Sequence, residues 1–316
     1  MQLLTPRRTA AFAVAGTLLG SMFVVGLTTA GGPTQVSAAS TSTCAGTLPP
    51  VASPTGQWSC TLDDEFNGTS LDTTKWQPML ASTSGYTTGP SGSSVCYENN
   101  PATISESGGY LNLSVVAAAQ AFSCKEFNSF NLWTKYEGGM VDSMGLFSQQ
   151  YGYFQVRAAM PAQSTPGLQE TLWLYPENET LYGPWPDSGE IDYGEFYSEY
   201  PNNDIPVDHF PGSKNDPNAT NNYCTLAGTA TAGQFNTYAI MWTPTTITTY
   251  FNGVPCMSDV YAHYVTWPDK APAPFNQPFF LNFTAALGNG SGNTFTASNT
   301  KLPATTKIDW ARVWQY

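Results

Sequence analysis

Positive charge is scarce in this sequence, and the scarcity limits what the chain can bind. The 316 residues include 11 lysines and arginines against 23 aspartates and glutamates, for a formal net charge of −12. After Arg8 the basic residues are scattered and form no cluster. Nucleic acids and anionic membranes would be repelled by such a chain. We therefore expect neither as a partner, and an uncharged ligand fits better.

Long stretches with helical apolar periodicity are also missing, so a helical fold is not expected. Charged residues of both signs make up only 11% of the chain, which argues against disorder. Aromatic residues make up 14%, and short alternating runs are separated by glycine, proline and asparagine. Such runs predict strands, and they cover residues 110–115, 152–158, 171–175, 237–242, 246–251, 278–283 and 307–314. This frequency of strands indicates an all-β sandwich or barrel.

The six cysteines lack the spacing of a metal site, because no two of them form a C-x-x-C pair and only two histidines are present. An even number of cysteines in an exported chain suggests three disulfides instead. Many pairings are possible. We expect sequence neighbours to pair, as Cys44–Cys60, Cys96–Cys124 and Cys224–Cys256.

The N-terminal segment carries the features of an export signal. Arg7 and Arg8 precede an apolar run over residues 10–27, and a small-residue site ends at Ala38. These features predict a cleaved signal peptide over residues 1–38, with an uncleaved membrane anchor as the alternative. Residues 39–57 are rich in serine, threonine, proline and alanine and read as a linker or lead-in, whereas 58–316 has the even composition of one domain. We therefore expect an extracellular protein with no membrane contact after cleavage, and a monomer.

The most informative stretch is E-I-D-Y-G-E over residues 190–195, which places three acids in one apparent strand. Acids are depleted in strands, so this density needs a reason. Glu190 and Asp192 face the same way, whereas Glu195 would face the other way in a regular strand. A β-bulge adds one residue and corrects this parity, and Gly194 is a residue that a bulge accepts. The competing interpretation is an acidic, solvent-exposed strand face.

A row of three carboxyl groups is suited to the cleavage of a glycosidic bond. Cleavage with retention needs one carboxylate as the nucleophile and one carboxylic acid as the proton donor, roughly 5–5.5 Å apart. Two glutamates whose side chains lean toward each other along a strand make that spacing feasible. A third acid between them holds the nucleophile and drives the pKa values of its neighbours apart.

At this point the chain resembles glycoside hydrolase family 16, whose catalytic strand reads E-x-D-x-E or, with a bulge, E-x-D-x-x-E. The bulged form is similar to residues 190–195, and five further segments resemble the family in order along the chain: 64–72 with Trp76, 109–113, 151–157, 235–244 and 309–313. One departure is clear, because Gln169 and Glu170 stand where the family often has a tryptophan and a proline.

The resemblance implies a β-jelly-roll sandwich with a concave substrate cleft. It also implies that Glu190 is the nucleophile, that Asp192 assists it, that Glu195 is the acid/base, and that catalysis needs no cofactor. The bulged motif looks most like the laminarinase branch, so the implied substrate is a β-1,3-glucan or a mixed-linkage β-glucan. Two alternatives remain open: a transglycosylase on the same fold, and a glycan-binding protein without catalysis.

Three further residues are candidates for substrate binding. Trp185 lies among prolines just before the acidic strand, where a cleft wall is expected. Trp173 alternates within an apolar strand and fits core packing as well as sugar stacking. His209 follows the acidic strand and could line the cleft.

A structural calcium ion is the one metal that the family resemblance implies. Its ligands would be Glu65, a carbonyl near Gly109 and Asp309, on the convex side away from the chemistry. Calcium prefers such oxygen ligands.

Overall fold

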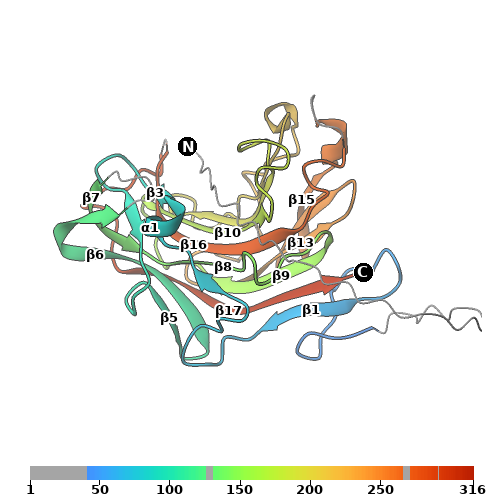
Figure 1. Ribbon diagram of the computed structural model, residues 1–316, viewed down its shortest axis with the longest axis horizontal. Coiled ribbons are helices and arrows are strands. Elements are labelled where there is room, and N and C mark those ends of the chain that lie inside the picture. The colour runs from blue at the N-terminus through green and yellow to red at the C-terminus, as the bar shows by residue number, and fades with distance from the viewer. Residues whose placement is uncertain (1–40, 126–130, 266–270, 291) are drawn as a thin grey trace, which may run out of the picture.

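The computed structural model describes residues 41–125, 131–265, 271–290 and 292–316, and the predicted signal peptide over 1–38 lies outside them. Two β-sheets are stacked face to face, as Figure 1 shows from the side. Helix in the described segments is limited to α1 (Ala81–Ser84), η1 (Ser213–Asn215) and η2 (Tyr261–His263). No helix there is long and apolar enough to cross a membrane. The all-β sandwich expected from the sequence is confirmed.

The back sheet has 11 strands and runs in the order β15-β14-β13-β9-β17-β6-β7-β4-β3, with β1 added beside β17 and β5 beside β6. Its strands are β1 (Ser59–Asp64), β3 (Thr87–Thr88), β4 (Val95–Tyr97), β5 (Ile104–Ser107), β6 (Tyr110–Lys125), β7 (Asn131–Gly138), β9 (Gly152–Ala159), β13 (Phe235–Trp242), β14 (Ile247–Phe251), β15 (Val254–Asp259) and β17 (Ala304–Gln315). Nearly all pairs are antiparallel; β4 and β7 are parallel.

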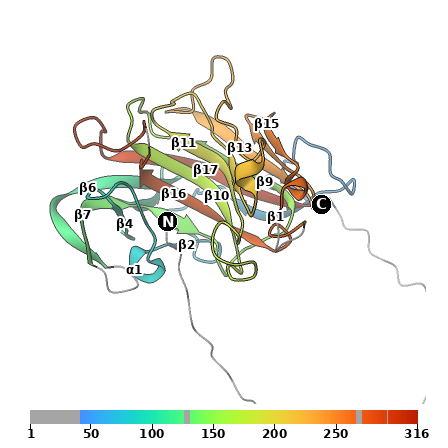
Figure 2. The same ribbon diagram turned by 90° about the horizontal axis from the view of Figure 1, so that it is seen from above.

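The front sheet has six strands in the order β12-β11-β10-β16-β8-β2, and Figure 2 shows β11, β10 and β16 side by side from above. Its strands are β2 (Gln77–Pro78), β8 (Met140–Asp142), β10 (Leu168–Pro176), β11 (Glu190–Tyr197), β12 (Val207–His209) and β16 (Phe279–Leu287). One face of this sheet packs on the back sheet. The other face is the floor of the site described below.

The alternation in the sequence explains which side chains fill the space between the sheets. Along β10, Leu172 and Leu174 are buried on the core side, whereas Thr171, between the buried residues Glu170 and Leu172, faces the outside of the sheet and is half-buried. The hairpin between β14 and β15 turns at Asn252 and Gly253, which have φ values of 50° and 77°. Asn and Gly adopt such positive φ values at little cost, which suits them to this turn.

Aromatic contacts in the core hold the front sheet in place. The ring of Trp76 lies 5.0 Å from that of Phe283, and the ring of Trp242 lies 5.1 Å from that of Phe279. The first pair of rings is tilted and the second is packed edge to face; both contribute buried area, and the edge-to-face pair also contributes ring electrostatics. All nine residues of β16 are buried. One face of the strand packs on the core, and the other includes Thr284 and Ala286 at the bottom of the pocket. β16, which pairs with β10 two strands away from the catalytic candidates on β11, is therefore held firmly in the sheet.

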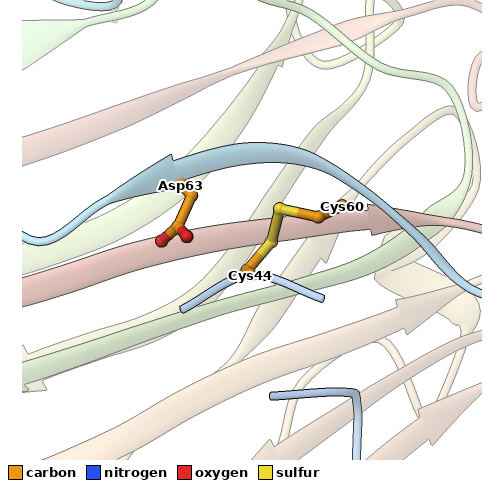
Figure 3. A group of neighbouring side chains, drawn as sticks. All are labelled: Cys44, Cys60 and Asp63. Carbon is orange, nitrogen blue, oxygen red and sulfur yellow. A yellow bond between two sulfur atoms is a disulfide. The ribbon is translucent and has the colours of Figure 1, made fainter. Parts of the chain in front are cut away.

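Three disulfides close the described segments, and each pairs sequence neighbours as predicted: Cys44–Cys60, Cys96–Cys124 and Cys224–Cys256. The first ties residues 41–57 to the start of β1, and Figure 3 shows it beside the carboxylate of Asp63. The third ties the segment after β12 to β15. Each removes conformational freedom from the unfolded chain.

Candidate active site

A β-bulge in β11 brings the three acids to one face of the front sheet. In the pairing with β10, Asp192 lies opposite Trp173 and Gly194 lies opposite Leu172, so Tyr193 is the extra residue. The bulge expected from the sequence is therefore present, with its extra residue one position before the glycine. Tyr193 is fully buried on the core side. A Cβ at Gly194 would lie 3.0 Å from Leu172, so the core leaves no room for a side chain at that position.

Glu190, Asp192 and Glu195 all line one pocket of about 280 Å³ on the open face of the sheet. They are 9%, 3% and 7% exposed, so the interpretation as a solvated acidic face is wrong. The remaining lining residues come from β3, β10, β11, β12, β16 and neighbouring loops and are Tyr86, Thr88, Gln169, Thr171, Trp173, Trp185, Tyr197, Val207, His209, Thr284 and Ala286.

Two hydrogen-bonding partners flank the row of acids. His209 Nε2 lies 3.2 Å from Asp192 Oδ2, because β12 pairs with β11 and places His209 opposite Glu190. At the other end, Gln169 Nε2 donates to Glu195 Oε1 at 2.7 Å. Asp192 and Glu195 are thus held by side chains on the neighbouring strands β12 and β10 rather than by flexible loops.

Burial raises the pKa of all three carboxyl groups above their ordinary values. For Glu190 the charge of Asp192 adds to burial, and for Asp192 the charge of Glu195 does so. For Glu195 the rise in pKa from burial is opposed by hydrogen bonds from Tyr197 and Gln169. Three close carboxyl groups with raised pKa values titrate as a unit, so the site retains protons to higher pH than free carboxyl groups would.

The three predicted substrate-binding residues all reach this pocket. Trp173 is 7% exposed and donates from Nε1 to Thr284 Oγ1 at 2.9 Å, so it is fixed in position and still lines the floor. The ring of Trp185 lies 5.2 Å from that of His209. Two indole rings beside three acids form a surface suited to the C–H face of a sugar ring.

The sequence did not single out several residues that complete the pocket. Gln169 was noted only as a departure from a familiar motif, although its alternation with Thr171 and Trp173 places it on the same face. Tyr197 follows β11's last acid by two positions, and the same period of two could have found it. Tyr86 comes from the loop after α1, and no local pattern in the sequence predicts its place.

Two groups of side chains among the described residues bring three possible metal ligands within 4.8 Å of one another. The first, Cys44, Cys60 and Asp63, has its two sulfur atoms joined in a disulfide and so offers no thiolate (Figure 3). The second is Glu190, Asp192 and His209, which belongs to the pocket just described.

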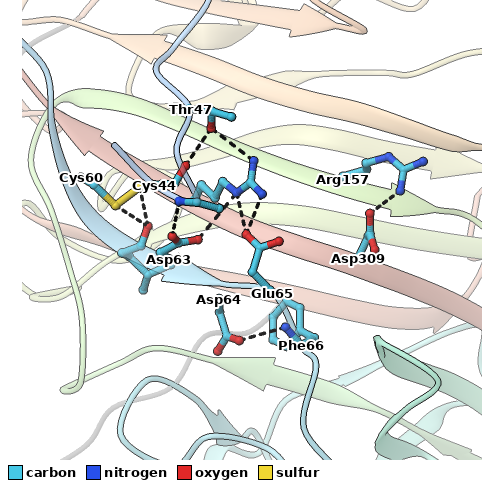
Figure 4. A network of polar contacts seen from close by, with 12 residues as sticks. Cys44, Thr47, Cys60, Asp63, Asp64, Glu65, Phe66, Arg157 and Asp309 are labelled. Carbon is cyan, nitrogen blue, oxygen red and sulfur yellow. Dashed lines mark hydrogen bonds and ion pairs between the residues drawn. A yellow bond between two sulfur atoms is a disulfide. The ribbon is translucent and has the colours of Figure 1, made fainter. Parts of the chain in front are cut away.

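The residues predicted to hold calcium do not fit a calcium site in this arrangement. Glu65 Oε1 accepts from Arg312 at 2.8 and 2.7 Å, and the guanidinium lies 4.1 Å from the ring centre of Trp310. Asp309 is paired with Arg157 (Figure 4). Each carboxylate therefore already faces a fixed positive charge, which would repel a cation.

The third predicted calcium ligand is a backbone carbonyl near Gly109. Gly109 lies in the turn before β6 with a φ of 79°, and a Cβ there would meet only the side chain of Asn67.

Comparison with known proteins identifies the family. The protein-family model described as "Beta-porphyranase A-D, GH16 domain" matches residues 58–316, which is most of the chain. The chain belongs to glycoside hydrolase family 16. Among curated family relatives, it is 27% identical to glucan endo-1,3-beta-glucosidase A1 of Niallia circulans over 80% of its length. It is 34% identical to keratan-sulfate endo-1,4-beta-galactosidase of Sphingobacterium multivorum over 57% of its length.

Solved structures agree with this family 16 fold. The endo-beta-1,3-glucanase of Pyrococcus furiosus superimposes with a TM-score of 0.68 at 21% identity, covering 84% of this chain and 97% of that one. The chain spans 37% and 40% of the length of the two curated relatives named above. Family membership is therefore shown, and the names of the relatives span glucans and galactose-containing glycans.

Proposed function

We propose that this chain is a retaining endo-glycoside hydrolase that cleaves a neutral β-linked glucan, with β-1,3 or mixed-linkage chains as its substrates. The observation that carries the proposal is the row of three buried acids on the bulged strand, in the pocket that Trp173 and Trp185 also line. A protein that only binds glycans would not need three buried carboxyl groups, because burying their charges costs free energy. A pair of carboxyl groups on either side of a sugar ring is what hydrolysis with retention requires.

In this proposal Glu190 attacks the anomeric carbon and Glu195 protonates the leaving oxygen, and Asp192 lies between them. Glu195 then removes a proton from the water that releases the glycosyl-enzyme. The division of roles rests on the family resemblance. The hydrogen bonds that Gln169 and Tyr197 direct at Glu195 favour its ionised form, which suits its second role as a base.

The charge of the pocket supports a neutral substrate. None of the described residues that line it is lysine or arginine, and three are acids. A sulfated chain, such as the one in the name of the keratan-sulfate relative, would be repelled by that lining. An unsulfated glucan meets no such repulsion, and its ring faces can stack on Trp173 and Trp185.

A panel of polysaccharides tests the substrate. We expect the purified protein to release short oligosaccharides from laminarin and mixed-linkage glucan, and none from keratan sulfate or porphyran. Mass analysis of the products also separates hydrolysis from transglycosylation, because only a transglycosylase forms oligomers longer than those supplied. Turnover of the sulfated chains alone would contradict the proposed substrate but leave the catalytic acids intact.

Chemical rescue tests the two glutamates. With an activated aryl β-glucoside, Glu195→Ala should keep its first step and accumulate the glycosyl-enzyme, because a good leaving group needs little protonation. Added azide should restore turnover and give the β-azide. Glu190→Ala lacks the nucleophile, so azide should attack directly and give the α-azide.

Glu177, an exposed acid just after β10, provides a matched control, and Glu177→Ala should behave as wild type. The opposite pair of azide products would swap the two roles. Near-normal activity of both pocket variants on laminarin would remove the catalytic assignment.

We also propose that residues 1–38 are removed on export and that the mature protein acts outside the cell as a monomer. N-terminal sequencing of secreted material should begin shortly after Ala38. Light scattering should give the mass of one chain, and a dimer mass would contradict the second part of this proposal.

A further inference from the structure

The edge strand β12 carries one acid, Asp208, on the side opposite the pocket. Its middle residue, Asp208, is fully buried, whereas its neighbour His209 faces the pocket. Asp259, at the end of β15, is also fully buried, and its carboxyl group lies within hydrogen-bonding reach of Asp208. Asp216, just after η1, is 7% exposed and reaches Asp259 as well. Three carboxyl groups from three segments therefore meet behind the edge of the cleft.

The oxygens of this cluster lack donors. Both oxygens of Asp208, both of Asp259 and Oδ2 of Asp216 have no hydrogen-bond partner, although all are buried. Only Oδ1 of Asp216 is satisfied, by the backbone N–H of Asn218 at 2.8 Å. Burial and the neighbouring carboxyl groups raise the pKa of Asp208 and Asp259. No positive group is among the influences on either acid.

The backbone around the cluster is fixed from several sides. The loop after β12 folds back, so that the N–H of Asp208 donates to the carbonyl of Ala219 at 2.8 Å. Asn221 Nδ2 donates to the carbonyl of Cys256 at 2.7 Å, and the Cys224–Cys256 disulfide joins the same two segments. The acids are thus brought together by the covalent structure and by backbone pairing, not by flexible side chains alone.

Two occupants could relieve the cost of these buried carboxyl groups. Shared protons satisfy at most one acceptor each, so three acids bonded in a chain would leave oxygens unsatisfied. A hard cation accepts about 6–8 oxygen ligands at roughly 2.3–2.6 Å and can use them all, with backbone carbonyls and water completing the shell. The oxygen count and the absence of nitrogen or sulfur ligands favour the cation.

We propose that Asp208, Asp216 and Asp259 bind a divalent cation of the calcium type behind the edge of the cleft. Asp259 lies between the other two. The three acids do not all lie within 4.8 Å of one another, so the ion draws the outer two toward Asp259. The bound ion would fix β12, and with it His209, which pairs with Asp192 at 3.2 Å.

This site is distinct from Glu65 and Asp309, which face arginines, and it does not depend on the proposed catalytic roles. The test uses the mature protein, stripped with EDTA and dialysed. We expect elemental analysis before stripping to give about one calcium per chain. Adding 1 mM CaCl2 after stripping should raise the melting temperature by several degrees, since only the folded state binds the ion. Terbium luminescence, excited through nearby aromatic rings, should be quenched by competing calcium.

Variants locate the site. Asp259→Asn should lose the calcium response, and Asp216→Asn, in an outer loop, should fold and bind calcium at least 10-fold more weakly. Asp204→Asn is the matched control: Asp204 is also fully buried with both oxygens unpartnered, yet lies outside the cluster. Asp204→Asn and Glu65→Gln should both retain the response.

Three results would overturn the proposal. The first is wild-type protein that holds no calcium and melts at the same temperature with and without it. The second is a calcium response that survives Asp216→Asn unchanged or disappears in Glu65→Gln. The third is an Asp259→Asn variant that melts higher than calcium-loaded wild type, which would mean that the acids share protons instead.

Discussion

Replacing Gly194 with alanine tests whether the bulge in β11 is what aligns the catalytic candidates. A Cβ at this position would lie 3.0 Å from Leu172 Cδ1 and 3.1 Å from Tyr238 Cδ1, closer than nearly all natural Cβ contacts. Leu172 belongs to β10 and Tyr238 to β13, in opposite sheets. To accommodate the methyl group, side chains of both sheets must give way by a few tenths of an ångström, or β11 must shift outward.

The size of the effect follows from these contacts. Forcing one extra carbon into a packed core costs about 1–3 kcal/mol. For a domain of this size that corresponds to a fall in melting temperature of about 2–12 °C, at roughly 2–4 °C per kcal/mol. Activity should fall further than stability, because a displacement of about 1 Å at reacting groups can cost about 100-fold in rate. Glu195 directly follows the altered position and moves with it.

The assay compares reducing-sugar release from laminarin with thermal melting for three proteins. Gly290→Ala is the matched control, since nothing lies within 4 Å of a Cβ there and its φ is ordinary. We expect Gly290→Ala to stay within about 0.5 kcal/mol of wild type and to keep full activity. A Gly194→Ala protein with wild-type kcat/KM would refute the reasoning, because the tight packing of Gly194 against the core would then not control the positions of the acids.

Three further predictions use other parts of the molecule. Gln169→Leu removes the 2.7 Å hydrogen bond that stabilises ionised Glu195, so the pKa of Glu195 should rise. The basic limb of the pH profile of kcat/KM should then move to higher pH. The control Thr171→Val should leave that limb in place. Burial holds the pKa of Glu170 well above 4.5. The contribution of this group to stability is therefore fully present below pH 4.5 and is lost as pH rises. The melting temperature of Glu170→Gln should decline less with rising pH than that of the wild type. Replacing both Cys96 and Cys124 with alanine should cost about 2–4 kcal/mol of unfolding free energy in urea titrations, and an unchanged midpoint would contradict that estimate.

The sequence predicted well where local periodicity decides the structure. The alternating run over 152–158 became β9, and the parity of the acids correctly demanded a bulge. Short strands such as β2 and β8 were not predicted, because two or three residues carry no period and are defined only by the strands beside them. Glu170 is the sharpest case: it lies in the core with Oε2 accepting from Thr306, a residue 136 positions away.

Contacts between distant segments explain the remaining differences. The calcium set predicted from resemblance involves Glu65, whose partner Arg312 is 247 residues away in sequence. Only the pairing of β1 with β17 brings them together. The acids of β12 and β15 were likewise unremarkable in sequence, since one lies in a three-residue strand and the other at a strand end. A site assembled from segments that are distant in sequence leaves no local pattern in the sequence.

The same pairing of first and last strands has an architectural consequence. Ser59 lies opposite Gln315, so the chain enters and leaves the sandwich at adjacent positions in the back sheet (Figure 1). The pocket opens on the far side of the other sheet. A peptide linker between the two strands could join them, and new ends could be opened at the Asn252–Gly253 turn without touching the cleft. Modules fused at either end would likewise emerge together behind the enzyme, and a polysaccharide chain could pass over the front unobstructed.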